Sequence, residues 1–362
     1  MKCAIIIPAL NPEEGLVSYI DELLALDIGP IILINDGSEP ETAPIFQKAA
    51  ARENCFLLTH QKNQGKGRAL KTGIRYYKKF FSALLGIITV DADGQHRIED
   101  VQKLYRRINE NPNTLILGSR DFGATTPTRS RIGNTLISFS MNFLYNVRLK
   151  DTQTGLRAIP SSMLDWVADL PGERYDFELN MLIVAQKKAV PIVTETIETV
   201  YYNNNKGSHY RTFSDSARII YHLSRAFIQY VLSSALSAIV DITTFILLSQ
   251  IFFSSFPLVE RLLYATIGAR MVSSIVNYSV NRHLIYAQSS RLYPTALKYY
   301  ILWFFQLISS FSLLWLISAK GPNEIITKIS VDLCLALISY QVQLRWVFRE
   351  KKVKKTLTHI AK

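Results

Sequence analysis

The chain has 362 residues, of which 48% are hydrophobic, and its formal net charge is +12. This length is enough for two or three domains. The three cysteines have neither metal-ligand nor CxxC spacing, which argues against a cysteine-based metal centre and indicates buried thiols in a reducing compartment. The positive charge is typical of proteins that bind phosphorylated substrates or anionic lipid headgroups. We predict no nucleic-acid partner, because the basic residues flank apolar and acidic segments without interleaved aromatic side chains.

The first 225 residues alternate between short apolar runs and helix-like segments. The first apolar run is too short for a signal peptide and fits a strand. Asn11 follows it in a position to cap the next helix, with Pro12 at the first helical position. The alternation predicts an α/β domain with a doubly wound, mostly parallel sheet. The predicted strands cover residues 3–8, 31–34, 56–59, 87–90 and 115–117, and the predicted helices lie near 41–53, 67–81 and 98–110.

Polar side chains gather where the predicted strands end. In a parallel sheet the carboxyl ends of the strands meet at one edge, where open α/β sheets bind ligands. We therefore expect a single site to which several segments contribute. These segments contain Asn11, Asp36, residues 63–68, the pair Asp91 and Asp93, and Arg120.

The acidic pair directly follows the apolar run 87–90. Asp91 and Asp93 stand at positions i and i+2 of an extended segment, so their side chains can point the same way. Two close carboxylates repel each other unless a cation lies between them. A hard divalent ion, Mg²⁺ or Mn²⁺, that holds a diphosphate is the natural candidate, and Gln95 offers a further oxygen ligand. The alternative is an Asp-Gly turn with solvated acids.

Two other clusters suit a nucleotide. Asp36 can accept hydrogen bonds from a base or a ribose, although a turn aspartate is an equal alternative. The run Gly65-Lys66-Gly67 offers bare backbone amides and a cation to an anionic group. Neither the Walker A pattern nor GxGxxG is present, so ATPase and dinucleotide-binding functions lack their usual support.

The order and spacing of these motifs resemble glycosyltransferase family 2, over residues 1 to about 212. The dolichol- or polyprenyl-phosphate sugar synthases are the most similar group within it. The resemblance implies a GT-A fold and a nucleotide-diphosphate sugar donor, a UDP- or GDP-hexose. One departure is Leu10, where the family usually has an aromatic residue, and Pro12 is an extra residue. The motifs are Pro-Ala-x-Asn, Asn-Asp-Gly-Ser, Asn-x-Gly-Lys-Gly, Asp-Ala-Asp-Gly-Gln-His and Gly-Ser-Arg.

The resemblance also implies roles for individual residues. Arg120, Arg131 and Arg211 would bind the acceptor phosphate and the leaving diphosphate, for which arginine forks are well suited. Together with Asp93 they are the predicted catalytic residues, whereas Arg129 alone fits a solvated surface. The implied donor-binding residues are Pro8, Leu10, Glu13, Asp36, Lys66, Asp91 and Ala92, and the implied metal ligands are Asp91, Asp93 and Gln95.

Asp176 and Glu178 resemble the family's acidic pair near the acceptor. Such a carboxylate acts as general base where the acceptor is a hydroxyl. A phosphate monoester is already anionic at neutral pH. We therefore expect Asp176 and Glu178 to be orienting or structural residues.

The second half of the chain is apolar. Residues 213–226 are amphipathic at helical spacing, which fits an interfacial helix or a helix packed on the sheet. Four apolar segments follow, each near the ~20 residues that span a membrane. Basic residues before the first, between the second and third, and after the fourth place the catalytic domain and both termini in the cytoplasm. The predicted spans are 227–253, 260–281, 297–318 and 325–345, in a membrane domain of residues 227–347 with a basic tail at 348–362.

Asp241 and Arg270 lie near the middle of the first two predicted spans. Isolated charges there are costly, so we expect a buried ion pair, which is either structural or part of a transport path. The four spans resemble the GtrA-like membrane domain, a family proposed to move or present lipid-linked sugars. This resemblance depends on Asp241, Ala269-Arg270 and residues 277–281.

We therefore expect a multi-pass protein of the cell membrane that transfers a hexose to a polyprenyl phosphate for cell-envelope glycan modification. The lipid phosphate attacks the anomeric carbon in line, and the metal stabilises charge on the departing nucleoside diphosphate. By resemblance, the reaction inverts the anomeric centre. Two alternatives stay open: a glycosyltransferase that extends a glycan, and a protein whose membrane domain moves a lipid-linked sugar. The sugar, the base and the formation of a homo-oligomer are left open.

Overall fold

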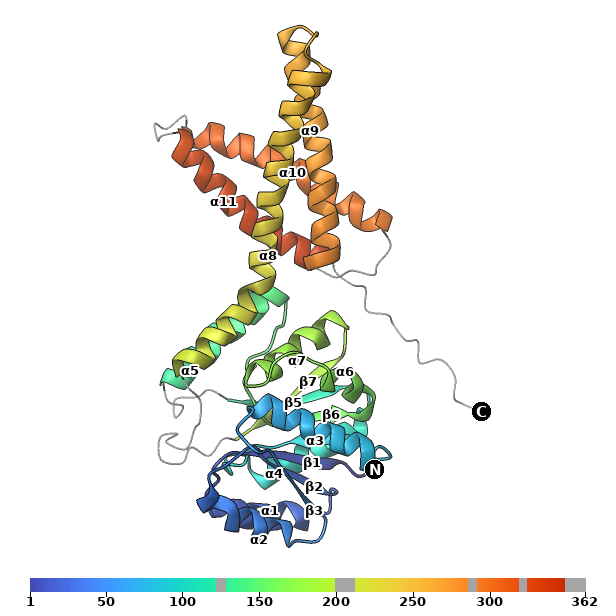
Figure 1. Cartoon of the computed structure of the whole chain (residues 1–362), viewed down its shortest axis with the longest axis vertical. Coiled ribbons are helices and arrows are strands. Elements are labelled where there is room, and N and C mark those ends of the chain that lie inside the picture. Colours follow the sequence, from blue (N-terminus) through green and yellow to red (C-terminus); the bar gives the residue numbers. More distant parts are fainter. Residues whose placement is uncertain (122–127, 199–211, 286–291, 319–323, 349–362) are drawn as a thin grey trace, which may run out of the picture. The chain divides into compact units, whose positions relative to one another are not determined.

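The computed structural model describes residues 1–121, 128–198, 212–285, 292–318 and 324–348 (Figure 1). The chain divides into two compact units, Met1–His222 and Leu223–Lys362. The first contains an α/β sheet domain and the second is helical. Each unit is described by itself.

A seven-stranded sheet forms the centre of the first unit, in the order β3-β2-β1-β4-β6-β5-β7. Strand β6 is antiparallel to β4 and β5, and every other pair is parallel. The predicted mostly parallel sheet is confirmed. The strands are β1 (Ala4–Ala9), β2 (Ile31–Asn35), β3 (Cys55–Thr59), β4 (Gly86–Thr89), β5 (Leu115–Arg120), β6 (Arg157–Pro160) and β7 (Ile192–Ile197).

Strands β6 and β7 were not predicted from the sequence. Strand β6 has only four residues and begins with an arginine. In β7 two exposed threonines and a half-buried glutamate interrupt the apolar pattern, because among the described strands β7 is the last of the sheet and pairs with β5 alone. A short strand and an edge strand give weaker apolar patterns than the central strands do.

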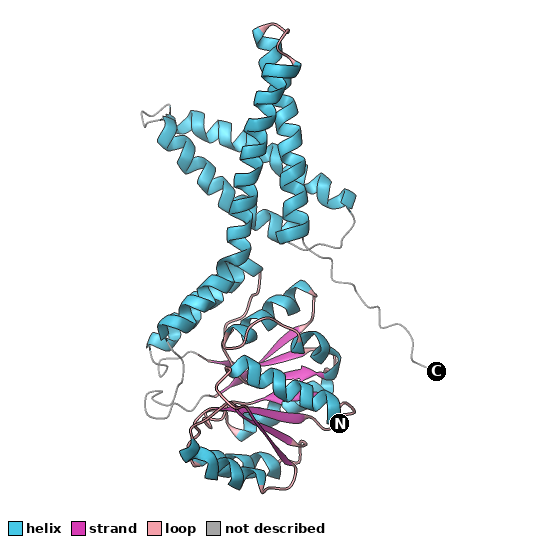
Figure 2. Ribbon diagram, viewed as in Figure 1, coloured by secondary structure: helices cyan, strands magenta, loops and turns pink. Residues whose placement is uncertain are grey.

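Helices cover both faces of the sheet (Figure 2). Ile5 and Ile7 of β1 belong to a core cluster with residues of α1, α2 and α4. Ile6 faces the other way, where Gly73 of α3 packs against it. Burial on both faces explains the continuous apolar runs of the central strands. The helices are α1 (Gly15–Ala25), α2 (Ala43–Ala50), α3 (Lys66–Phe80), α4 (Ile98–Glu110), α5 (Thr128–Tyr145), α6 (Leu164–Ala168) and α7 (Asp176–Lys187), with short 3-10 turns η1 (Pro40–Thr42) and η2 (Ser161–Met163).

The predicted cap at Asn11 is wrong. Helix α1 begins only at Gly15, and its N-cap residue Glu14 makes no side-chain capping bond. The backbone N–H of Asn11 donates to Ser38 Oγ at 2.9 Å, and its side-chain oxygen accepts from Glu39 N at 2.7 Å. Asn11 therefore joins the loops that follow β1 and β2.

The strand order reverses direction between β1 and β4. From β1 the chain first builds β2 and β3 on one side, and then returns to place β4 on the other side. Such a switch point opens a crevice at the carboxyl ends of the two strands, where α/β proteins bind ligands. Because β6 is antiparallel, Arg157 at its amino end lies opposite Thr89 of β4. The loop before β6 thus reaches the same edge.

The second unit consists of helices that cover the four apolar segments. Helix α8 (Thr212–Leu247) runs without a break through both the amphipathic segment and the first apolar segment. It continues as the π-helical turn η4 (Leu248–Phe252). The others are α9 (Leu258–Val280) with η5 (Asn281–Ile285), α10 (Leu292–Ser318), and α11 (Glu324–Val342) with η6 (Gln343–Val347).

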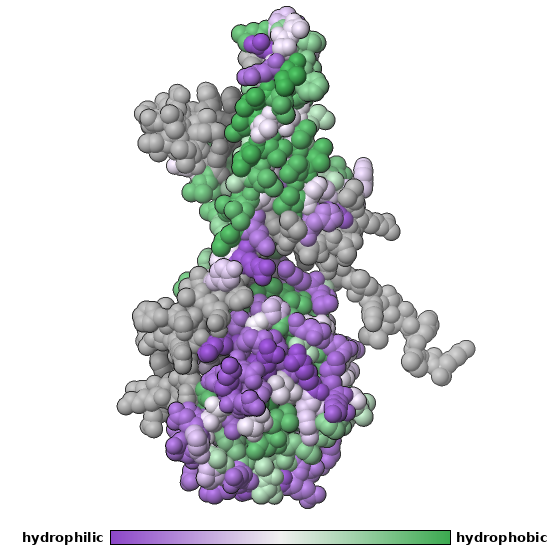
Figure 3. Space-filling model, in the orientation of Figure 1, coloured by the Kyte–Doolittle hydropathy of each residue, from purple (hydrophilic) through white to green (hydrophobic). Residues whose placement is uncertain are grey.

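Among the described residues, one stretch, Leu223–Phe252, is long and apolar enough to cross a membrane by length and composition. Apolar side chains cover much of the surface of α8 and α9 in Figure 3. Membrane crossing by the other three helices stays a prediction.

Neutral polar side chains connect the helices inside this unit. Asn281 Nδ2 donates to Asn277 Oδ1 at 2.9 Å and to Gln343 Oε1 at 3.0 Å. Asn281 Oδ1 accepts from the hydroxyl of Ser233 at 2.7 Å, and Tyr299 donates to Asn277 Oδ1 at 2.8 Å. The hydrogen bonds link α8, α9, α10 and the end of α11, and buried amides need such partners.

Candidate active site

Lys66 is the centre of the charged cluster at the carboxyl edge of the sheet. It opens α3, directly after Gly65, whose φ of 103° is open to glycine and strained for other residues. Its Nζ atom lies 2.7 Å from Asp91 Oδ1 and 3.1 Å from Glu178 Oε1. One ammonium group thus joins the loop after β4 to helix α7.

The charges in this cluster stabilise one another. Burial by itself lowers the pKa of Lys66, but the carboxylates of Asp91 and Glu178 outweigh it and raise that pKa above its ordinary value. Burial by itself raises the pKa of Asp91, but Lys66 and His96 outweigh it and hold that pKa well below its usual range. Lys66 is therefore a cation and Asp91 an anion at neutral pH.

Asp93 lies beside this ion pair in a different electrostatic situation. Its Oδ1 atom accepts a hydrogen bond from Gln95 N at 3.1 Å. Partial desolvation, followed by the charge of Asp91, raises the pKa of Asp93. Within the described ranges no basic side chain forms an ion pair with Asp93. A cation at this position would relieve the repulsion between the two carboxylates.

The donor set here fits a hard divalent ion. The described residues contain no group of three or more His, Cys, Asp and Glu side chains able to hold a metal by themselves. Mg²⁺ commonly uses one or two carboxylates and completes its shell with water and substrate phosphates. Asp93, with Asp91 and Gln95 beside it, is such a partial set.

His96 and Tyr19 support the loop that carries the two aspartates. His96 Nε2 lies 3.3 Å from Asp91 Oδ2. Tyr19 donates to the backbone oxygen of His96 at 2.6 Å, and both side chains are buried. Neither residue was expected to have a role, although His96 closes the Asp-Ala-Asp-Gly-Gln-His motif.

Gly155 gives Asp91 the space it occupies. A Cβ atom on Gly155 would lie 2.3 Å from Asp91 Oδ2. The hydroxyl of Thr89 donates to Gly155 O at 2.7 Å, which fastens this glycine to β4. No local pattern in the sequence indicates this contact, because it depends on the antiparallel pairing of β6.

Arg157 is a buried arginine that organises the same loop. Its guanidinium donates to the backbone oxygens of Thr154 at 3.0 Å and Glu178 at 2.7 Å. The guanidinium also donates to Thr152 O at 3.3 Å. Burial lowers the pKa of Arg157. Arg157 therefore ties the loop before β6 to the first turns of α7, where Glu178 lies.

Asp36 acts as the anchor of the glycine loop. Its Oδ1 atom accepts from Gln64 N at 3.0 Å and lies 2.6 Å from His60 Nδ1, and its Oδ2 atom accepts from Gly65 N at 2.7 Å. His60 Nε2 in turn lies 3.0 Å from Thr72 Oγ1. The protein itself thus uses both carboxylate oxygens, and a nucleoside at Asp36 would have to share them.

Arg120 is oriented by a buried carboxylate. Its Nε lies 2.7 Å from Asp151 Oδ2 and its Nη2 lies 3.0 Å from Asp151 Oδ1, so the pair is bidentate, and Asp151 is fully buried.

Asp176 stabilises the turn before α7. Its carboxylate accepts a hydrogen bond from the backbone N–H of Arg174 at 3.0 Å.

The other predicted site residues are distributed as follows. Pro8 is half-buried near the end of β1, and Leu10 is half-buried just after it. Glu13 is exposed, and Ala92 is half-buried next to Asp91. Arg131 is exposed on α5. Arg211 lies outside the described residues. The structure thus brings Lys66, Asp91 and Glu178 together directly, and it places Pro8 on β1, the strand beside β4, with Leu10 in the loop that follows.

An α/β sheet with clustered charges at its switch point is an architecture that many nucleotide-binding enzymes share. Residues 4–164 match the family described as Glycosyl transferase family 2. The chain therefore carries a domain of this family, and the protein is a glycosyltransferase.

Curated relatives extend the similarity beyond the family match. The UDP-N-acetylglucosamine–dolichyl-phosphate N-acetylglucosaminyltransferase of Methanococcus voltae is 29% identical over 227 residues, which cover 57% of this chain and 89% of that protein. The dolichyl-phosphate beta-glucosyltransferase of Homo sapiens is 26% identical over 215 residues, which cover 53% of this chain and 65% of that protein.

Solved structures resemble the chain less closely. Glucosyl-3-phosphoglycerate synthase from Mycobacterium tuberculosis, in complex with Mn²⁺, uridine diphosphate and phosphoglyceric acid, is 18% identical with a TM-score of 0.45. The match covers 64% of this chain and 78% of that one.

Proposed function

We propose that this glycosyltransferase moves a hexose from a nucleotide-diphosphate sugar to a polyprenyl phosphate. The observation that carries the proposal is the Lys66, Asp91 and Glu178 cluster, with Asp93 beside it, at the switch point of the sheet. The names of the curated relatives, which specify dolichyl phosphate as acceptor, support the choice of a polyprenyl phosphate.

The donor diphosphate would lie at the carboxyl ends of β1 and β4, within a GT-A type domain. Asp93, Asp91 and Gln95 would hold Mg²⁺ or Mn²⁺ there, and the ion would stabilise negative charge on the leaving nucleoside diphosphate. The backbone amides at the start of α3 favour an anion near Lys66. Pro8, Leu10 and Glu13 would line the nucleoside side of the crevice, and Asp36 would act mainly by fixing the loop before Lys66.

The acceptor needs charge neutralisation more than deprotonation. A phosphate monoester carries more than one negative charge at neutral pH and can attack without a general base. Arg120, held by Asp151, would face this phosphate together with Arg131 and Arg211, so that two anions can approach each other. Glu178 would position Lys66, and Asp176 would hold the turn. A direct in-line attack inverts the anomeric centre.

The second unit would hold the enzyme at the bilayer. The stretch Leu223–Phe252 has the length and composition of a membrane span. We propose that the other three helices also cross the cell membrane, with the catalytic domain and both termini in the cytoplasm. The polyprenyl phosphate would then meet the site at the membrane surface, and the product would be a lipid-linked monosaccharide for cell-envelope glycans.

A donor screen tests the proposal. Purified full-length protein in detergent is mixed with Mg²⁺ or Mn²⁺, undecaprenyl phosphate and each of several UDP- and GDP-hexoses, and the release of UDP or GDP is measured. We expect release from one donor that requires both the lipid and Asp93, with Asp93→Asn as the inactive variant. Release without lipid would indicate hydrolysis or another acceptor, and no release from any donor would favour glycan extension or lipid-linked sugar translocation.

A further inference from the structure

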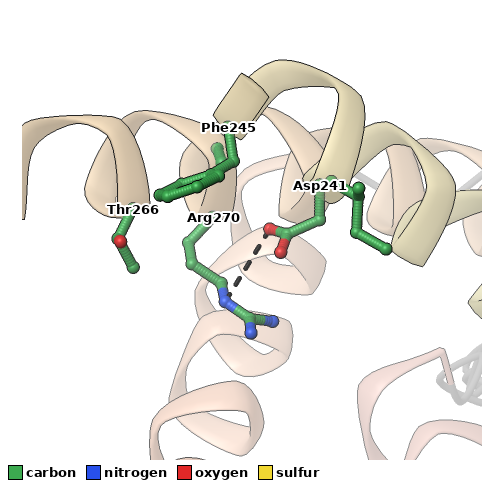
Figure 4. Close-up of a pocket in the computed structure, with 6 residues that line it drawn as sticks. Asp241, Phe245, Thr266 and Arg270 are labelled. Atoms are coloured by element: carbon green, nitrogen blue, oxygen red, sulfur yellow. Dashed lines mark ion pairs between the residues drawn. The ribbon is translucent and has the colours of Figure 1, made fainter. Parts of the chain in front are cut away.

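An ion pair joins two helices of the second unit (Figure 4). Arg270 Nε of α9 lies 3.7 Å from Asp241 Oδ1 of α8, and the hydroxyl of Ser273 donates to the same oxygen at 2.9 Å. The predicted pair is present, but the prediction that it is buried is wrong, because the Arg270 side chain is 61% exposed.

The surroundings of this pair are apolar and equally exposed. Ile239 and Ile242 project from α8, and Ile267 and Met271 project from α9, all with at least half of their surface accessible. A cavity of about 270 Å³ opens beside the ion pair. It is lined by Asp241, Ile242, Phe245, Thr266, Ala269 and Arg270.

Arg270 cannot reach water if these helices cross a bilayer. Asp241 lies at least about 15 Å along the helix axis from either end of the candidate span Leu223–Phe252. Snorkelling brings an arginine to the interface only from near a helix end. Within the bilayer, the exposed guanidinium of Arg270 is costly because it is charged. In water, the four large apolar side chains around it would be costly to expose. Some group must cover this face.

The charges of the patch indicate what covers it. A phosphate drawn to Arg270 would also meet the carboxylate of Asp241. A second copy of the same surface offers an aspartate to each arginine and apolar side chains to the apolar rim. In a twofold dimer each contact occurs twice: residue i of the first copy meets residue j of the second, and residue j of the first meets residue i of the second. A patch that carries both an aspartate and an arginine can therefore pair with a second copy of itself.

We propose that this face, formed by Asp241, Arg270 and the four apolar residues around them, binds a second copy of the chain. Arg270 of one copy faces Asp241 of the other. Polar contacts of this kind stabilise helix association in membranes. The inference depends on the proposed membrane location of α8 but not on the transfer reaction. A failed donor screen would therefore leave it standing.

Charge exchange between copies tests the pairing. Full-length protein is incorporated into lipid vesicles at low density, and subunits are counted by single-molecule photobleaching. We expect dimers of the natural protein, and dimerisation weaker by on the order of tenfold for Asp241→Arg alone and for Arg270→Asp alone. A mixture of the two variants restores dimers, because each copy then offers the charge that the other lacks. A monomeric natural protein, undiminished single variants, or a mixture that stays monomeric would each overturn the proposal.

Cross-linking tests the location without changing the charges. In a Cys334→Ser background, Ile242→Cys places a thiol on the proposed face, and Phe304→Cys places one on the exposed surface of α10 as the matched control. Under mild oxidation we expect covalent dimers from Ile242→Cys, about tenfold more than from Phe304→Cys. Equal yields would show that the contact is random or lies elsewhere, and would reject this face as the interface. This measurement also covers the case in which the charge variants fail to fold.

Discussion

The Nζ atom of Lys66 lies 2.7 Å from the Oδ1 atom of Asp91. Lys66 begins α3, which packs on β1 through Gly73 and Ile6, and Asp91 follows β4, the neighbour of β1 in the sheet. The ion pair therefore depends on this packing between segments that are distant in the chain. Asp91 is thereby held as an anion, while Asp93 is left as the acid that a metal ion would neutralise.

Removing the charge of Lys66 should damage the reaction. With Lys66→Met, Asp91 and Glu178 lose their shared cation and repel each other, so we expect turnover to fall on the order of 100-fold. The measurement is donor-dependent release of nucleoside diphosphate. Lys78→Met is the matched control, because Lys78 lies on the same helix and pairs with the exposed Asp165. Equal activity of the Lys66 and Lys78 variants would contradict the role of Lys66.

The contact between Gly155 and Asp91 predicts a steric effect. In Gly155→Ala the new methyl group would overlap the Asp91 carboxylate, so we expect a loss of metal and donor binding with little change in overall fold. Circular dichroism and donor titration separate these two outcomes. Gly133→Ala on α5 serves as control, because outside its own helix turn no described atom lies within 4 Å of its Cβ position. A Gly155 variant with unchanged donor affinity would refute the prediction.

Divalent metal should stabilise the protein through Asp93. In the presence of nucleoside diphosphate, saturating Mg²⁺ or Mn²⁺ is expected to raise the melting temperature by about 5 °C. EDTA should remove this increase, and Asp93→Asn should abolish it because the variant lacks the proposed carboxylate ligand. Asp165→Asn, a surface control, should keep the full increase. A metal-dependent shift that survives in Asp93→Asn would place the ion elsewhere.

The buried partner of Arg120 should matter for stability. Asp151 is fully buried and binds the guanidinium with both oxygens. Asp151→Asn leaves a charged arginine poorly compensated, so the free energy of unfolding of this unit should fall by about 3 kcal/mol. Asp165→Asn, in an exposed pair, should change it by less than about 0.5 kcal/mol. Pulse proteolysis in urea measures both, and similar values for the two variants would argue against a structural role for the pair.

The buried thiols predict a pH dependence. Burial raises the pKa of Cys3 to about 12 and the pKa of Cys55 to about 11, from the ordinary value of 9.0. The folded state keeps these protons while the unfolded chain loses them above pH 9, so their contribution to stability is complete below pH 9 and is lost between pH 9 and about 12. Brief alkylation at pH 8 should therefore spare both cysteines in folded protein and modify them after unfolding. Rapid alkylation of Cys3 in folded protein would contradict this burial.

The sequence was informative wherever neighbouring residues determine the structure. The apolar runs predicted the central strands correctly, because both faces of those strands are buried. The polar residues that directly follow these runs predicted the edge of the sheet that carries the charged cluster. Strand β6 escaped prediction because it is short and begins with an arginine, so it has no continuous apolar run. The cap at Asn11 was wrong because Ser38 and Glu39, in the loop after β2, take its hydrogen bonds.

The sequence alone therefore determined the class of fold and indicated the aspartates, the glycine loop and Lys66 of the candidate site, since these follow from local patterns. Only the tertiary structure decided which groups face one another. Glu178 reaches Lys66 and Gly155 makes room for Asp91 through contacts between residues far apart in the chain. The carboxylate of Asp36 accepts hydrogen bonds from the backbone amides of residues 64 and 65. The side chain of Arg270 is exposed at the surface of its helix. Such pairings depend on strand order and helix packing, which no local pattern specifies.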